Sequence, residues 1–244
     1  HSRRDFHAKL LGSAITFSLV ETLWGRDLFA ADAKPAIQQW VAELAEMSKD
    51  LKGQKLTDLQ FQTKMEDLYK RVNLADLCSL IKLDEAEKKR LPDSGAGNFG
   101  FDLSKVEGLP ADVGFGKQIF GCKKGRSIVP HGHANMCTGF IILKGEWHGR
   151  HYDRVETKAD HYVIRPTIDR TFKPGELSTI SDHKDNVHWF HCASETGYIF
   201  NAHFTGYDPT ILAPPGRVYL DPQGEKISGG LIKAAKMNSE ECHK

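Results

Sequence analysis

Short apolar segments that recur about every ten residues constrain the fold of this chain more than any other feature. From residue 110 onward, runs rich in Val, Ile, Phe, Tyr and Thr alternate with turns rich in Gly, Pro and Asp. Many short strands at this spacing are typical of an antiparallel sandwich or barrel. We expect strands at 117–122, 126–131, 136–144, 146–154, 161–165, 176–181, 187–192, 197–205 and 217–220. The sequence therefore predicts a mainly β protein.

Residues 36–90 have a different, helical pattern. Apolar residues recur there at i, i+3 and i+4, as on the buried face of a helix, first at Ile37, Trp40, Val41, Leu44 and Met47. A second helix follows, for which Thr57 and Asp58 are candidate N-caps. We divide the chain into a signal-like segment (1–33), a helical extension (34–95), a β-barrel (96–230) and a C-terminal tail (231–244).

Composition excludes several classes of function. The net charge of +1 gives no reason to expect a nucleic-acid or polyanion partner. The five cysteines are odd in number and contain no CxxC, which argues against a zinc ribbon or a disulfide framework. Buried free thiols are the better interpretation, and we expect Cys137 and Cys192 to fill small spaces in the core.

The N-terminal residues resemble a twin-arginine export signal. The paired arginines of "SRRDF" (2–6) precede an uncharged run (10–20), and Ala31 and Ala33 form a small-x-small site. The run is too short to span a bilayer as a stable helix, so no membrane span is expected. This resemblance implies an exported or periplasmic protein. The alternative is a cytoplasmic protein whose first segment is an amphipathic helix, since Glu21 interrupts the apolar region early.

Histidines carry the strongest chemical signal in the chain, which has twelve of them. His131 and His133 are two residues apart, so on a strand their imidazoles point to the same face and can bind one metal ion together. A third ligand must come from another strand. "NVHWFH" offers His188 and His191, one on each face of its strand, and "NAHFTG" offers His203.

The first histidine pair lies in a pattern that resembles the first cupin motif, G-x5-H-x-H-x3-4-E-x6-G. Here five residues separate Gly125 from His131-Gly132-His133, four more precede Thr138, and six separate Thr138 from Gly145. Only the glutamate is missing, and Thr138 takes its place. The second motif is looser, and His188 matches its histidine. The resemblance covers residues 120–205 and implies a cupin (jelly-roll) β-barrel.

A cupin without the glutamate resembles the three-histidine subgroup best known from the thiol dioxygenases. This resemblance implies that His131, His133 and His188 hold Fe(II), and that O2 adds to a small organic substrate. It also implies a role for a histidine fifteen residues after the third ligand, here His203, with Asn201 beside it. A homodimer is expected from the broader resemblance to cupins, which commonly pair through their sheets.

Two departures from the thiol dioxygenases bear on the substrate. In cysteine dioxygenase the outer histidine lies in Ser-x-His-x-Tyr, whereas the last residue of the corresponding stretch here is Thr205. The cross-linking cysteine of that enzyme falls at Thr138, one residue after Cys137. No cysteine–tyrosine cross-link is therefore expected, and we carry over the three-histidine site and the outer histidine without the substrate.

Other metals and functions remain open at this point. Zinc, nickel, copper or manganese would accept the same ligands, and the protein would then be a lyase, isomerase or hydrolase. A cupin module that only binds a small ligand is the third alternative. The basic residues considered for orienting an anionic substrate are Lys117, Arg126, Arg150 and Arg165. Phe140, Trp147, Trp189 and Tyr198 are candidates for an apolar pocket wall, although aromatic residues on strands pack in the core more often than they line a pocket. The histidines expected at the surface are His148, His151, His161 and His183, with the alternative that the stretch "HGRHYDR" (148–154) lines a barrel mouth.

Overall fold

The structure, a computed structural model, describes residues 36–211, 216–238 and 240–243. The helices in this part of the chain are α2 (Ala36–Lys52), α3 (Asp58–Tyr69), α4 (Leu74–Leu80) and α5 (Leu83–Glu87), with 3₁₀ helices η1 (Ser228–Gly230) and η2 (Glu241–His243). None of the described helices has both the length and the apolar character that crossing a membrane requires. The signal-like segment lies outside the described residues, so the export signal stays a prediction.

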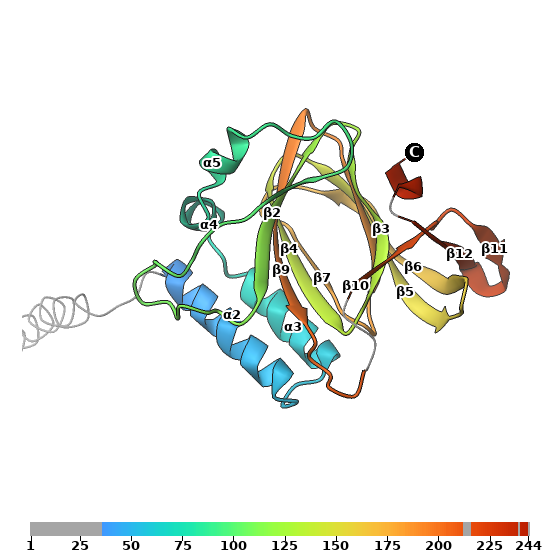
Figure 1. The fold of residues 1–244 in the computed structure, drawn as a ribbon, viewed down its shortest axis with the longest axis horizontal. Helices are drawn as coiled ribbons and strands as arrows, with labels where there is room; N and C mark the ends of the chain where they lie inside the picture. The colour runs from blue at the N-terminus through green and yellow to red at the C-terminus, as the bar shows by residue number, and fades with distance from the viewer. Residues whose placement is uncertain (1–35, 212–215, 239, 244) are drawn as a thin grey trace, which may run out of the picture. The chain divides into compact units, whose positions relative to one another are not determined.

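The strands form two antiparallel sheets (Figure 1). The first contains, in spatial order, β1 (Gly97–Phe99), β2 (Gly116–Lys123), β9 (Thr196–Thr205), β4 (Met136–Lys144) and β7 (Leu177–Ile180). The second contains β10 (Gly216–Leu220), β3 (Ser127–Ala134), β8 (Val187–Cys192), β5 (Trp147–Thr157), β6 (His161–Phe172), β12 (Leu231–Met237) and β11 (Glu225–Ile227).

The order of these strands defines the fold. Counting from β2 to β9, the first sheet takes the first, eighth, third and sixth strands, and the second takes the second, seventh, fourth and fifth. This is the order of a double-sheet jelly roll, which is built from two Greek keys. The predicted mainly β jelly-roll barrel with an N-terminal helical extension is therefore confirmed.

Helices α2 and α3 lie along the outer face of the first sheet (Figure 1). Strand β9 shows the consequence: Phe200 and Phe204 pack under the helices, whereas Ile199 and Asn201 point into the barrel. This alternation is the two-residue period of a strand. The helices cover one face of β4 and β9, and the barrel interior covers the other, so both strands are buried on both sides. The interior of the barrel contains a separate apolar cluster and a cavity.

The helix ends follow local sequence signals. Thr57 caps α3: its hydroxyl accepts a hydrogen bond from the backbone N–H of Gln60, whose side chain in turn accepts one from the N–H of Thr57. This is the reciprocal capping box. The predicted N-cap at Thr57 is thus confirmed.

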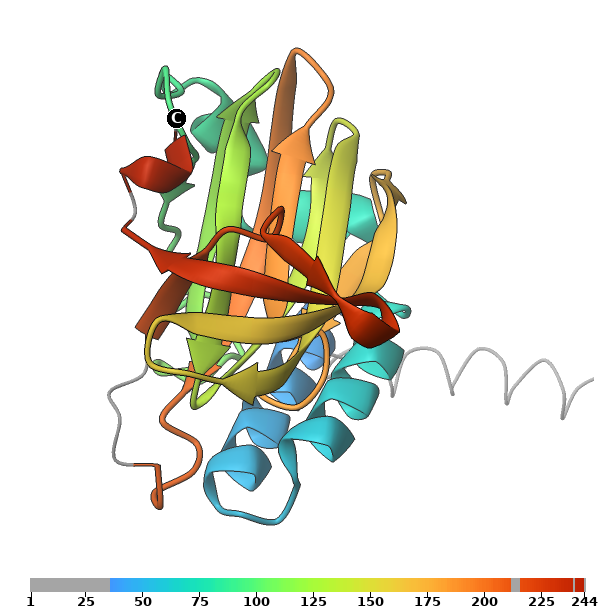
Figure 2. The ribbon, with the colours of Figure 1, turned by 90° about the vertical axis from the view of Figure 1, so that its right-hand side faces the viewer.

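The C-terminal region differs most from the expected organisation. Residues 231–237, expected in a tail, form β12, which pairs with β6 and with β10 (Figure 2). Strand β6 runs to Phe172, beyond the predicted end at 165, although it contains Pro166. The pairing with β5 shifts register between His151 and Tyr152, beside the proline. A proline is tolerated within a sheet where the ladder is irregular, because it has no N–H to donate.

Candidate metal centre

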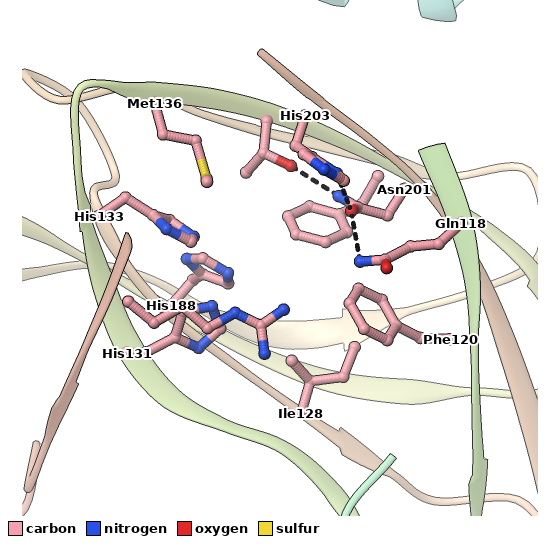
Figure 3. Close-up of a pocket in the computed structure, with 12 residues that line it drawn as sticks. Gln118, Phe120, Ile128, His131, His133, Met136, His188, Asn201 and His203 are labelled. Carbon is pink, nitrogen blue, oxygen red and sulfur yellow. Dashed lines mark hydrogen bonds between the residues drawn. The ribbon is translucent and has the colours of Figure 1, made fainter. Parts of the chain in front are cut away.

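Three buried histidines from two neighbouring strands meet inside the barrel (Figure 3). His131 and His133 lie on β3, and His188 lies on β8 directly opposite His131 in the ladder. Their exposed fractions are 1%, 3% and 0%, and one nitrogen of each ring lies within 4.8 Å of the others. The structure therefore brings together the three residues that the sequence selected as ligands.

An irregularity in β3 turns the histidine pair inward. Ile128 already faces the interior, so strict alternation would place Pro130 and Gly132 inside and both histidines outside. The ladder between β3 and β8 shifts register between Ile128 and His131. Such a bulge adds one residue to a strand and redirects the side chains that follow it.

Each of these three histidines has one ring nitrogen that is hydrogen-bonded and one that is not. His131 donates from Nδ1 to the Val129 carbonyl (2.7 Å), His188 from Nδ1 to the Asn186 carbonyl (3.4 Å), and the His133 ring hydrogen-bonds the Gly216 backbone. Each remaining nitrogen, Nε2 of His131, Nδ1 of His133 and Nε2 of His188, is buried without a partner among the described residues.

Three unpartnered buried acceptors at one place are costly unless something binds them. A metal ion fits this donor set, because neutral imidazoles bind metals through a free lone pair while the other nitrogen is fixed by a hydrogen bond. Burial lowers the pKa of all three rings, that of His133 to about 3, with neighbouring positive groups adding to the effect. At neutral pH all three are therefore in the metal-binding form.

A hydrogen-bonded polar wall faces the histidines across the cavity. Asn201 on β9 donates to the Thr138 hydroxyl (2.6 Å), and its oxygen accepts from Gln118 (3.1 Å) and from Nδ1 of His203 (3.3 Å). The His203 ring lies against Gly116, where a Cβ atom would come within 2.0 Å of Nε2. His203, Asn201 and Thr138 thus all line the cavity, and Thr138, at the position of the motif's missing glutamate, serves as a hydrogen-bonding group.

The cavity between the histidines and this wall has a volume of about 230 Å³. Its lining comprises Gln118, Phe120, Ile128, His131, His133, Met136, Thr138, Phe140, His188, Asn201, His203 and Arg217. Among the described residues that line it there is no carboxylate, and Arg217 is the one cation. Arg217 comes from β10, where it pairs with His133, and its guanidinium carbon lies 5.7 Å from the centre of the Phe120 ring.

Arg217 was missed by sequence reasoning, and the four basic residues proposed instead do not line the cavity. Arg217 is itself exposed but lines the cavity, whereas Arg126 and Arg165 are exposed elsewhere, and Arg150 pairs with Asp169 and stacks on Trp189. The signal that could have found Arg217 is its place at the start of a predicted strand. The local sequence does not indicate, however, which strand β10 pairs with.

The aromatic wall was predicted in part. Phe140 lines the cavity, and so does Phe120, which was not among the expected aromatic residues. Trp147 is buried in the barrel core, Tyr198 packs with the helices, and Trp189 lies in a different hollow with residues of η2. The expectation of core packing for Cys137 and Cys192 is confirmed, since both are free and fully buried.

His151, expected at the surface, is fully buried instead. It stands opposite His188 in the β5–β8 ladder, and the centres of the two rings are 6.4 Å apart. Its Nε2 lies 3.2 Å from the Ser178 hydroxyl, and its Nδ1 has no partner among the described residues. The polar stretch "HGRHYDR" gave no sign of this burial, because buried and partly exposed residues alternate along the first part of β5. His191 is not a member of the metal cluster, as expected, and its ring hydrogen-bonds the Ser127 hydroxyl.

We expect the metal-free protein to lose stability as the pH falls below about 6.5, the pKa of histidine in an unfolded chain. Burial lowers the pKa of His133 and His151 to about 3 in the folded protein. Between these values the unfolded state binds more protons, so stability that is present above pH 6.5 is lost at up to about 1.4 kcal/mol per pH unit for each histidine. Urea unfolding of chelator-treated protein near pH 7.5 and near pH 5 measures this loss. His151→Phe should show a shallower dependence, and an unchanged one would contradict the assignment.

Comparisons with known proteins add little to this picture. No family model and no curated protein matches the chain. An oxalate oxidase in complex with the substrate analogue glycolate is 16% identical with a TM-score of 0.36, over 52% of this chain and 56% of that chain. An uncharacterized conserved protein with a double-stranded β-helix domain from Klebsiella pneumoniae subsp. pneumoniae is 12% identical with a TM-score of 0.35, over 50% and 81%.

The 11S globulin procruciferin from Brassica napus is 13% identical with a TM-score of 0.33, and the match covers 45% of this chain and 23% of that chain. The chain thus spans less than two thirds of the procruciferin and oxalate oxidase chains it matches. The jelly-roll assignment rests on the strand order of the two sheets.

Proposed function

We propose that this protein is a mononuclear metal-dependent oxygenase that holds Fe(II) with His131, His133 and His188 and adds O2 to a small anionic organic substrate. One observation carries the proposal: three buried, unpartnered imidazole nitrogens face a cavity whose one cation among the described residues is Arg217. Fe(II) held by neutral ligands keeps its full positive charge and supplies binding positions for substrate and O2.

Arg217 gives the cavity its preference for an anion. A guanidinium binds a carboxylate through two parallel hydrogen bonds, and none of the described lining residues carries a competing negative charge. The side chains of Phe120, Ile128 and Phe140 form an apolar surface of the cavity, against which a short aliphatic portion of the substrate can pack. A small carboxylic acid, including one that carries a thiol, suits this combination.

His203 is the group best placed to move a proton. Its Nδ1 donates to Asn201, so Nε2 keeps its lone pair. Burial, together with the charges of Arg217 and Lys117, lowers the pKa of His203, which keeps the ring neutral at neutral pH. In this state Nε2 can accept a proton from a substrate thiol or hydroxyl, while Asn201 fixes the orientation of the ring.

Metal analysis followed by O2 uptake tests the proposal. Protein purified without added metal should contain close to one iron per chain, and His131→Ala should contain none. The iron protein should then consume O2 with thiols or other small acids. Zinc, nickel, copper or manganese in place of iron, without O2 uptake, would favour a non-oxidative lyase, isomerase or hydrolase. No metal in either protein would contradict the proposal and favour a ligand-binding module.

Arg217→Gln is expected to raise the KM for anionic substrates by about 10- to 100-fold, since a hydrogen bond to a charged group contributes about 1.5–3 kcal/mol. Metal content should stay unchanged, because Arg217 is not a ligand. Steady-state O2 uptake measures both kcat and KM. Arg150→Gln is the matched control, since that guanidinium pairs with Asp169 and does not line the cavity. Equal KM values for Arg217→Gln and the wild type would exclude this role.

A further inference from the structure

The ladder between β3 and β8 ends two residues before His133, the last metal-site residue of β3. His131 and His188 form its final pair, and in the same register His133 would stand opposite Asn186. The backbone pair is not made there. Instead, the Asn186 side chain accepts a hydrogen bond from the His133 N–H (3.3 Å) and donates one to the His133 carbonyl (3.1 Å). The side-chain amide thus makes the two hydrogen bonds that a backbone pair would make with His133.

The backbone of Asn186 contacts the other strand's ligand. Its carbonyl oxygen lies 3.4 Å from Nδ1 of His188, the bond that leaves Nε2 of that ring free for a metal. One residue therefore orients ligands on both strands: the side chain holds the backbone of His133, and the main chain holds the ring of His188.

Asn186 is itself held from several directions. It is fully buried, and its Nδ2 also lies within hydrogen-bonding distance of the Ser181 carbonyl (3.1 Å) and Oδ1 of Asp182 (3.4 Å). Arg154 hydrogen-bonds the same two segments: it donates to the His133 carbonyl (2.8 Å) and to the Asp182 carbonyl (3.3 Å). The amide cannot turn without leaving buried polar groups unpaired, which is energetically unfavourable.

This contact also explains the glycine between the two histidines. A Cβ atom at position 132 would lie 2.8 Å from Oδ1 of Asn186 and 3.1 Å from a methyl group of Val187. The space that a side chain would fill is the space that the amide uses to reach His133. Glycine is therefore required by the close approach of Asn186.

We propose that Asn186 is a positioning residue that sets the mutual orientation of His133 and His188, and through it the affinity and coordination geometry of the metal centre. The inference rests on the proposed metal site. Hydrogen-bonding partners that orient metal ligands typically contribute 10- to 100-fold to metal affinity, which is the size of effect expected here.

Co(II) binding to the full chain tests the inference without any assay of activity. The Kd comes from titration, and the visible absorption of bound Co(II) reports its coordination geometry. Asn186→Ala should raise the Kd by about 10- to 100-fold and change the spectrum. Ser181→Ala is the matched control: this residue is also buried in the β7–β8 loop, but among the described residues its hydroxyl accepts only from the loop N–H groups of His183 and Lys184. It should keep the wild-type spectrum.

Gly132→Ala provides a second route, because it displaces the amide without deleting it. Its Kd should rise as in Asn186→Ala, and adding it to Asn186→Ala should cost less than adding it to the wild type. If Asn186→Ala does not fold, Gly132→Ala decides the question. Wild-type affinity and spectrum in the folded variants would overturn the role of Asn186 alone, whereas wild-type protein that binds no Co(II) would overturn the metal site as well.

Discussion

Replacing His188 by alanine is expected to lower the affinity for Fe(II) or Co(II) by more than about 100-fold, since even residues that only orient a ligand contribute 10- to 100-fold. His188 is the one member of the cluster on β8, and without it both remaining donors come from β3. The metal would then keep two neighbouring imidazoles on one side. Equilibrium dialysis with metal analysis measures the change, and O2 uptake should be lost with the metal.

His151→Ala is the control for this experiment. His151 is the same residue type, is as fully buried as His188, and stands opposite it in the β5–β8 ladder. It does not belong to the cluster of converging nitrogens. Removing it leaves a cavity and an unpaired Ser178 hydroxyl, so stability should fall while the metal is retained. If both variants lost the metal equally, the loss would reflect general damage to the barrel rather than a missing ligand.

Phe61→Ala is expected to reduce the free energy of unfolding by about 3–5 kcal/mol, a large share of the 5–15 kcal/mol typical of a domain. Phe61 on α3 is fully buried, and its ring meets that of Phe204 on β9 edge to face, with centres 4.7 Å apart. Helix α3 also packs closely on β4, where a Cβ atom at Gly139 would lie 2.7 Å from the sulfur of Met65. The helical extension and the first sheet thus share one core.

Leu59→Ala is the matched control for Phe61→Ala. Leu59 lies on the same helix with 45% of its surface exposed, so its truncation should change stability by no more than about 0.5 kcal/mol. Urea unfolding followed by circular dichroism measures both variants. Folded Phe61→Ala should still bind metal, because the three histidines lie on the other sheet. A loss as small as that of Leu59→Ala would show that the helices and the first sheet do not share a core.

The sequence alone determined the elements of the fold and the residue types of the site. Strand periodicity placed β2 to β10 within a few residues, apart from the longer β6, and the polar residues around Thr57 located the start of α3. These signals are local, because a strand or a helix cap depends on residues close in the chain. The spacing of His131 and His133 predicted a pair of metal ligands, and the resemblance to the second cupin motif added His188. The structure brings these three residues together.

Tertiary structure decided which side chains enter the cavity. The register shift in β3 turns His131 and His133 inward, against the alternation that starts at Ile128. Pairing of β10 with β3 brings Arg217 to the cavity, and pairing of β5 with β8 buries His151. The hydrogen bonds between Asn186 and His133 depend on where the β3–β8 ladder ends, which only the tertiary structure shows. Contacts of this kind join residues far apart in the chain, and a slip of one residue reverses the face of a strand, so local sequence patterns cannot specify them.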